Sequence, residues 1–432
     1  MRHWLLTLEL IDSPLTHVLL GVAAVLLAVA VLVRPWRPWR IAIAAAAGAA
    51  VGAGAYLLLN GLNVFGVQLP IRALAYSAIG LGGAAAGIAA AWSRPWWRRT
   101  IAIVGAIAAL LGGALGVNRT FGVDHNLAAL LSVQAADPAV LPPQTATAAP
   151  DAPLYETWTP PAGMPAKGTI GALEGANAIP SPGYSPREGA IYLPPAALVA
   201  DPPALPLIVF MMGQPGSPDP TSIARALDAY AARHEGLAPI AIVADQLTRT
   251  TVDPACHDSE RYGAVSGYFN VSIPAWARAH LNVIDDGRYW TIGGYSNGGA
   301  CAWAWAATYP SVWGNVLDVS GNEFPGSDTV DKTVQEVFDG DRAAFDAAAP
   351  LAQLAQHPGA YDGHVAIFTS GADDTTYGPA QQRNADAAEA AGFTVRTETI
   401  PGAGHLGPAL DQGLVLGIAD LGAALGLAPP AS

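Results

Sequence analysis

Charged residues are scarce in this sequence. They make up 13% of the 432 residues against 52% for hydrophobic residues, and the mean hydropathy is +0.31. A chain this apolar is not a plain soluble enzyme and indicates a membrane portion. The first 120 residues have no lysine. Nine arginines and two acidic residues give them a net charge of +7, which leaves −20 for residues 121–432. So acidic a segment is a poor candidate for binding nucleic acid.

Cofactor motifs are missing as well. The sequence has no metal-ligand cluster, no phosphate-binding loop and no dinucleotide fingerprint, so we expect no cofactor. Cysteine is rare: there are two, Cys256 and Cys301, both in the acidic part. Their redox state depends on the side of the membrane on which that part lies.

Four apolar stretches are each close to the ~20 residues that cross a bilayer. They are residues 15–33, 41–59, 71–92 and 101–117, of which the last is the shortest. Their glycine and alanine content suits close packing of helices in lipid. We therefore predict an all-α transmembrane domain of four helices over residues 1–120.

The arginines predict how these helices are oriented. The loops 34–40 and 93–99 each contain three arginines and interfacial tryptophans, whereas the loop 60–70 is uncharged. The positive-inside rule places both arginine loops in the cytoplasm, and hence everything after about residue 118 outside. A signal peptide fits poorly, because no small-residue cleavage site follows a short apolar stretch near the start. Outside the cytoplasm, Cys256 and Cys301 are expected to form a disulfide, the alternative being two buried thiols.

Residues 121–165 are expected to link this domain to a second one. From residue 134 the segment is rich in Ala, Pro and Thr and lacks periodicity, which is typical of an extended tether. The alternative is a proline-rich surface of the folded domain.

Short strand and helix patterns alternate over residues 166–432. Strands are expected at 189–193, 205–212, 239–244, 289–292, 316–319, 365–370 and 394–400, and helices at 220–234, 268–280, after residue 296, at 379–391 and from 407. This alternation predicts an α/β domain with a mostly parallel sheet covered by helices on both faces.

The motif G-x-S-x-G joins an expected strand to an expected helix. It comprises Gly294, Ser296 and Gly298, the pattern of a nucleophile elbow. A serine at the tip of such a sharp turn is exposed, and the glycines allow strand and helix to approach closely. The helix that follows favours developing negative charge at its N-terminus. We therefore predict that Ser296 is a catalytic nucleophile rather than an incidental turn residue.

A serine needs a base and a group that orients the base. In this type of fold they follow the serine in the order acid, then histidine. Asp374 follows the strand at 365–370 and is the favoured acid, with Asp373 as the alternative. If neither aspartate is catalytic, they are expected to cap a helix or to form a turn. His405 lies in a glycine-rich loop after the last strand and is predicted to be the base.

Four competing histidines are interpreted as structural. They are His257, His280, His357 and His364, none of which occupies the third place in that order. Trp303 and Trp305, on the helix after the serine, are expected in the core rather than in contact with substrate.

An oxyanion hole requires two backbone donors. One is expected to be the N–H of Asn297, immediately after the nucleophile. The other is expected to be the N–H of Gln214, since the glycines at 213 and 216 let the loop after the strand at 205–212 turn towards the site. The alternative is that this loop is an ordinary glycine turn without a catalytic role.

With these motifs, the chain resembles the esterase family of α/β-hydrolases that includes the esterase D type and the mycolyltransferases of actinobacterial envelopes. The similar stretches are 187–195 (REGAIYLPP), 207–213 (LIVFMMG), 294–299 (GYSNGG), 309–314 (YPSVWG), 320–321 (SG) and 404–405 (GH). The resemblance spans about 170–425 and implies an α/β-hydrolase fold over 166–432. The chain has Met212-Gly213 where many relatives have His-Gly or Asp-Gly. Mycolyltransferases typically use Glu as the acid, so Asp374 favours the broader esterase group.

The sequence therefore favours a membrane-anchored, extracytoplasmic serine esterase that acts on an ester or lipid substrate. One alternative is an acyltransferase that moves the acyl group to an envelope sugar or lipid, and an amide-cleaving peptidase is less favoured. An alternative of another class is a catalytically silent fold that serves as an envelope binding or sensing domain.

Overall fold

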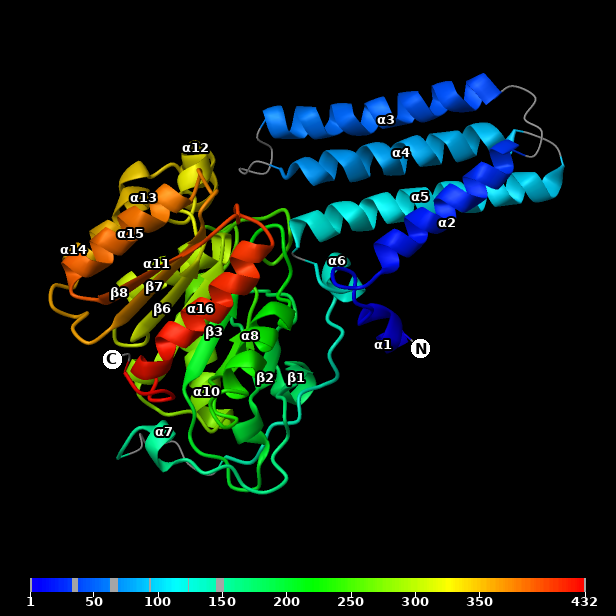
Figure 1. Ribbon diagram of the computed structural model, residues 1–432. Coiled ribbons are helices and arrows are strands. Elements are labelled where there is room, and N and C mark those ends of the chain that lie inside the picture. The colour runs from blue at the N-terminus through cyan, green and yellow to red at the C-terminus, as the bar shows by residue number, and fades with distance from the viewer. Residues whose placement is uncertain are drawn as a thin grey trace. The chain divides into compact units, whose positions relative to one another are not determined.

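The computed structural model describes residues 2–32, 38–62, 69–92, 95–122, 124–144 and 151–430 (Figure 1). The chain forms two compact units, residues 1–130 and 131–432. The elements described in the first unit are helices, and the second unit is built on a β-sheet.

Among the described residues of the first unit, four helices are long and apolar enough to cross a membrane, as the sequence predicts. They are α2 (Leu15–Leu32), α3 (Pro38–Gly61), α4 (Ile71–Ala91) and α5 (Trp96–Phe121). Small residues bring the backbones of α4 and α5 together, since a Cβ added to Gly113 would lie only 2.6 Å from the Cα of Gly80. The absence of side chains at Gly80 and Gly113 therefore allows this close approach.

Helix α5 differs from the prediction because it begins at Trp96, five residues before the expected start at 101. Two of the arginines assigned to the loop 93–99, Arg98 and Arg99, belong to its first turn. Arg98 is 4% exposed, and its Nε donates a hydrogen bond of 2.7 Å to the carbonyl oxygen of Ala30 in the last turn of α2. Arg98 thus satisfies a carbonyl in the last turn of α2, where carbonyl groups lack partners within the helix.

Parts of the three expected loops lie outside the described residues: 33–37, 63–68 and 93–94. The same holds for residues 145–150 of the expected linker.

Within its described residues, the second unit contains an eight-stranded sheet in the order β1-β2-β4-β3-β5-β6-β7-β8 (Figure 1). The strands are β1 (Thr169–Ala172), β2 (Ala190–Leu193), β3 (Leu207–Met211), β4 (Ile240–Val243), β5 (Trp290–Tyr295), β6 (Asn315–Val319), β7 (Val365–Gly371) and β8 (Thr394–Ile400). Strands β3 to β8 are parallel, and β2 is antiparallel to both β1 and β4. All carboxyl ends of the parallel strands therefore meet at one edge.

Helices cover both faces of this sheet (Figure 1). On one face α16 (Pro408–Ala424) packs against α8 (Thr221–Ala231) and against β6, β7 and β8. On the other, α11 (Asn297–Thr308) packs against β5 and β6, and α15 (Gly378–Ala391) against β7 and β8. A mostly parallel sheet between two helical layers, with a sharp strand-to-helix turn at Ser296, is the predicted α/β-hydrolase fold.

Several short elements were not predicted from the sequence. They are β1 and three helices between β6 and β7, namely α12 (Val330–Val337), α13 (Arg342–Ala348) and α14 (Pro350–Gln356). The helix expected at 268–280 is divided into a π-helical turn, η3 (Tyr268–Ser272), and α10 (Ile273–His280). Pro274 lies just after the division and has no N–H for the regular helical ladder. The remaining turns are α1 (Arg2–Leu6), α6 (Leu127–Leu130), α7 (Leu154–Thr157), α9 (Val265–Gly267), η1 (Gly175–Asn177), η2 (Pro195–Leu198), η4 (Gly287–Tyr289) and η5 (Ser327–Thr329).

The segment expected as a tether is attached to the sheet-containing unit at several points. The N–H of Ala139 donates to the carbonyl oxygen of Ala172 in β1 at 2.9 Å, and Gln144 Nε2 donates to the carbonyl oxygen of Leu281 at 3.0 Å. Further along, Trp158 Nε1 donates to the carbonyl oxygen of Glu235 at 2.9 Å. These hydrogen bonds fit the alternative interpretation at three points, and the extent of the linker stays a prediction.

Candidate active site

Ser296 occupies the turn between β5 and α11 in a strained backbone conformation. Its φ of +55° and ψ of −118° are unusual for a residue with a side chain, and its N–H donates to the carbonyl oxygen of Val319 at 2.8 Å. The two flanking glycines are needed for space. A Cβ on Gly298 would lie 2.5 Å from the carbonyl oxygen of Met211, and a Cβ on Gly294 would overlap the backbone of Gly298. The motif therefore has the steric basis inferred from the sequence.

The structure brings together Ser296, His405 and Asp374. His405 Nε2 lies 2.9 Å from Ser296 Oγ, and His405 Nδ1 lies 2.9 Å from Asp374 Oδ2. Because an ionised carboxylate only accepts hydrogen bonds, Nδ1 carries the proton and Nε2 is free to accept from the serine hydroxyl. Asp374 and His405 are 7% and 8% exposed, whereas the neighbouring Asp373 is exposed.

Backbone hydrogen bonds keep Asp374 in its charged form. Its Oδ1 accepts from the N–H groups of Tyr377 at 2.9 Å and Thr376 at 3.1 Å. Burial raises the pKa of this carboxyl, but the hydrogen bonds from His405 and from the backbone outweigh it and hold the pKa below its ordinary value. Asp374 is therefore ionised at neutral pH and can stabilise a positive charge on His405.

Two tyrosines restrain the histidine. The hydroxyl of Tyr295 donates to the carbonyl oxygen of His405 at 2.8 Å, and the ring of Tyr377 lies 4.6 Å from the imidazole ring. The Tyr377 hydroxyl in turn donates to Asp328 Oδ2 at 3.0 Å. These contacts limit the rotation of the imidazole. A base needs such a fixed orientation because it accepts a proton in one step and donates it in the next.

The two predicted oxyanion donors belong to segments that flank Ser296. Asn297 is the first residue of α11, where N–H groups have no partner within the helix. Gln214 follows Gly213, and a Cβ on Gly213 would lie 3.0 Å from the Cβ of Ser296. The loop after β3 thus passes directly against the nucleophile, in the place that a second donor requires. Their roles as donors remain a prediction.

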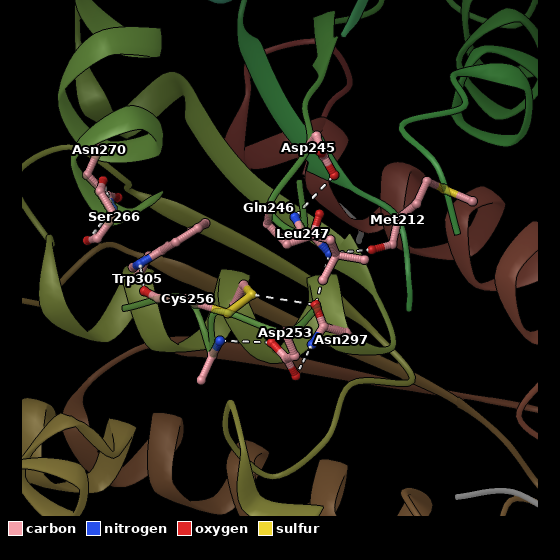
Figure 2. The surroundings of a disulfide bond; sticks show 12 residues. Met212, Asp245, Gln246, Leu247, Asp253, Cys256, Ser266, Asn270, Asn297 and Trp305 are labelled. Atoms are coloured by element: carbon pink, nitrogen blue, oxygen red, sulfur yellow. Dashed lines mark hydrogen bonds between the residues drawn. A yellow bond between two sulfur atoms is a disulfide. The ribbon is translucent and has the colours of Figure 1, made fainter. Parts of the chain in front are cut away.

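A buried polar network lies behind these donors and was not predicted from the sequence (Figure 2). The Oδ1 of Asn297 accepts from Gln246 Nε2 at 2.9 Å, and its Nδ2 donates to Asp253 Oδ2 at 3.0 Å. Gln246 Nε2 also donates to the carbonyl oxygen of Met212 at 2.6 Å. Gln246 and Asp253 belong to no motif. The available indication was their position after the buried strand β4, at the edge of the sheet where sites of α/β folds form.

A disulfide joins Cys256 to Cys301, whose Cα atoms are 5.5 Å apart (Figure 2). It connects the loop after β4 to α11, and Trp305 Nε1 donates to the carbonyl oxygen of Cys256 at 3.0 Å. The Sγ of Cys301 lies 4.0 Å from Asn297 Oδ1, a contact rather than a hydrogen bond because a disulfide sulfur has no proton. Trp303 and Trp305 are 0% and 2% exposed and belong to the core, as expected.

Asp318 lies beneath the first turn of α11 and is fully buried. Its Oδ1 accepts from the N–H of Gly321 at 2.9 Å and its Oδ2 from Gln381 Nε2 at 3.0 Å. Burial outweighs these hydrogen bonds and raises the pKa of Asp318 to about 7 from an ordinary value of 3.8. Between pH 3.8 and about 7, the carboxyl of Asp318 is therefore protonated in the folded chain and ionised in the unfolded chain.

We expect this carboxyl to make stability depend on pH. Between the two pKa values the folded state binds more protons, so the free energy of unfolding falls as pH rises from 3.8 to about 7, by at most about 4 kcal/mol. Asp318→Asn cannot titrate. The difference in unfolding midpoint between the wild-type chain and this variant, measured in detergent from about pH 4 to about pH 8, should therefore decrease as pH rises. A difference independent of pH would contradict this account of Asp318.

One group of side chains among the described residues is arranged as a metal could require. Glu9, Asp12 and His125 have ligand atoms within 4.8 Å of one another. All three belong to the first unit.

No family model matches the chain. Among curated proteins, the chain is similar to an uncharacterised protein of Corynebacterium glutamicum, with 29% identity over 241 residues. The match covers 54% of this chain and 56% of that protein, so it spans little more than half the length of the relative.

Solved structures of several hydrolases are similar to part of the chain. An S-formylglutathione hydrolase from Agrobacterium tumefaciens has a TM-score of 0.48 at 16% identity, covering 60% of this chain and 95% of its own. A ferulic acid esterase has a TM-score of 0.47 at 12% identity, covering 60% and 99%. The fluorophosphonate-binding serine hydrolase F of Staphylococcus aureus has a TM-score of 0.46 at 16% identity, covering 59% and 98%. Because these identities and TM-scores are low, the chemistry of the site is inferred from the residues of this chain alone.

Proposed function

We propose that this chain is a membrane-anchored serine hydrolase that cleaves carboxylic esters through an acyl-enzyme on Ser296. The observation that carries the proposal is the continuous hydrogen-bonded series from Ser296 Oγ through His405 to Asp374, with both distances at 2.9 Å. A strained serine at a strand-to-helix turn, a base and a buried carboxylate are the three parts that acyl transfer to serine requires.

In the first half-reaction, His405 Nε2 takes the proton of Ser296 as Oγ attacks the ester carbonyl carbon. The N–H groups of Asn297 and Gln214 stabilise the negative charge that develops on the carbonyl oxygen. His405 then gives its proton to the leaving alcohol as the carbon–oxygen bond of the ester breaks. Asp374 stays ionised throughout and holds the imidazole in the required tautomer.

In the second half-reaction, His405 takes a proton from water as the water oxygen attacks the acyl carbon. The bond to Ser296 Oγ then breaks, and the proton returns from His405 to the serine. A sugar or lipid hydroxyl in place of water would undergo the same steps and make the protein an acyltransferase. The difference depends on which acceptor reaches the acyl-enzyme.

The placement outside the cytoplasm is part of the proposal. Two features support it: the arginine distribution among the four apolar helices, and the disulfide between Cys256 and Cys301, which is favoured by an oxidising compartment. An outside position would bring the site close to envelope esters, lipids or glycans.

A membrane-impermeant fluorophosphonate tests activity and location together. On intact cells stripped of their outer envelope, the full-length chain is expected to be labelled, and Ser296→Ala is expected to lose all labelling. Labelling of the wild-type chain only after the membrane is opened would contradict the outside placement, but it would still support hydrolase activity. No labelling in either condition would favour the silent binding or sensing domain.

An ester panel of increasing chain length, with and without sugar acceptors, separates the two enzymatic alternatives. A hydrolase releases the free acid in both cases, whereas an acyltransferase yields an acylated sugar at the expense of the acid. The acyl chain that gives the highest kcat/KM identifies the substrate class.

A further inference from the structure

We propose that Gln246 is a positioning residue that fixes the spacing between the two oxyanion donors. This inference rests on the proposed function, because it assigns a role within the same site. The two hydrogen bonds that the side-chain nitrogen of Gln246 donates go to neither Ser296 nor His405. Its side chain instead connects the two segments of backbone that carry the donors, the loop after β3 and the first residue of α11 (Figure 2).

Gln246 is 2% exposed, and its side-chain amide uses both of its hydrogens. One is donated to the carbonyl oxygen of Met212 at 2.6 Å and the other to Asn297 Oδ1 at 2.9 Å. Met212 lies two residues before Gln214, the predicted donor of the β3 loop, and Asn297 supplies the other donor. A single rigid amide group therefore links both sides of the oxyanion hole across β3 and β5.

The orientation of this amide is determined by its neighbours. Asn297 presents its oxygen to Gln246 because its Nδ2 donates to Asp253 Oδ2 at 3.0 Å. Asp253 has its other oxygen occupied by the N–H of Ala255 at 2.8 Å, next to the disulfide-bonded Cys256. Acceptors at both ends of the series thus allow only one arrangement of hydrogens, with Gln246 donating twice.

The segment that carries Gln246 is also held in place. Asp245 is 1% exposed, forms an ion pair of 2.7 Å with Arg187, and accepts from the N–H of Leu247 at 3.1 Å. Arg187 extends to the β3 loop as well, where Nη2 donates to the carbonyl oxygen of Gly216 at 3.0 Å. The backbone that carries Gln246 is therefore held in a fixed position.

Spacing matters because oxyanion donors act at about 2.7–3.1 Å from the charged oxygen. Loss of the link would let the β3 loop and α11 move independently and lengthen one of the two bonds. The cost falls on the transition state, in which the charge develops, and much less on the ground-state complex. A change at Gln246 should therefore lower kcat and leave KM nearly unchanged.

The experiment compares Gln246→Leu with a matched control in the full-length chain in detergent. Asn315 is a similarly buried amide, 1% exposed, that donates to the carbonyl oxygens of Arg288 and Trp290 at 2.8 and 3.3 Å. It begins β6 at the opposite edge of the sheet from Ser296. Asn315→Leu thus removes the same kind of hydrogen bonds without affecting the oxyanion hole.

With p-nitrophenyl acetate, Gln246→Leu is expected to lower kcat about 10- to 100-fold while KM changes less than about threefold. Phenylboronic acid forms a tetrahedral adduct with a serine oxygen, and its inhibition constant should rise by a similar factor. Asn315→Leu should lower the unfolding midpoint while keeping kcat within about twofold. If Gln246→Leu does not fold, Gln246→Met replaces it: it has a similar length and no hydrogen to donate, and the same loss of kcat is expected.

Unchanged kcat and boronate affinity in the Gln246 variants, with only the unfolding midpoint lowered, would overturn the inference. The proposed function would then stand, provided that wild-type turnover is lost in Ser296→Ala. If wild-type turnover does not depend on Ser296, the proposed function fails and the role of Gln246 fails with it.

Discussion

Replacing Ser296 with alanine is expected to lower kcat for ester hydrolysis by at least about 10⁴-fold. The reason is that the change removes the hydroxyl that lies 2.9 Å from His405 Nε2 at the N-terminus of α11. Whatever rate remains comes from water attacking a substrate that is still held by the oxyanion donors. Initial rates on a short p-nitrophenyl ester, with the unfolding midpoint as a check on folding, measure this loss.

A double variant shows whether Ser296 and His405 act as one unit. His405→Ala alone should cost about as much as Ser296→Ala, and the two changes combined should cost little more than either alone. If the fold-loss in kcat of the double variant equals the product of the two single losses, the residues act independently, and the hydrogen bond between them has no catalytic role.

Replacing Asp374 with asparagine is the second large effect, at about 10⁴-fold in kcat. An amide nitrogen facing His405 Nδ1 would favour the tautomer that carries its proton on Nε2, and such a histidine cannot accept the proton of Ser296. The isosteric change leaves packing nearly intact, so KM and the unfolding midpoint should change much less than kcat.

The adjacent carboxylate provides a matched control for this variant. Asp373 is exposed, and its N–H donates to the carbonyl oxygen of Ala403 at 2.8 Å, a bond that survives Asp373→Asn. We expect this variant to keep kcat within about twofold. Equal losses in both variants would point to a general effect of local charge rather than to orientation of the histidine.

The choice between these two aspartates illustrates where sequence reasoning ends. Strand β7 and the order of serine, acid and histidine identify the segment, since both are local patterns. The two carboxylates are neighbours, and only the turn decides which faces the histidine. The N–H of Asp374 donates to the carbonyl oxygen of Gly371 at 3.1 Å, and this turn directs the Asp374 side chain inward.

The parts missed were those that depend on distant contacts. Gln246 meets Met212 and Asn297 across 34 and 51 residues, and no spacing rule applies to such a network. Helix α5 was expected to start later because arginines are typical of loops between membrane helices, whereas Arg98 is satisfied by a carbonyl of α2. Strand β1 has only four residues, including a glycine, which is too short for a clear alternating pattern.

The most direct test of the central claim is mass spectrometry of the full-length chain after brief mixing with a p-nitrophenyl ester and acid quench. The account predicts that the mass of one acyl group is added to the peptide that contains Ser296, that the adduct accumulates in the burst phase, and that it is absent from Ser296→Ala. Ester turnover without an adduct on Ser296, or with the adduct on another residue, would contradict it.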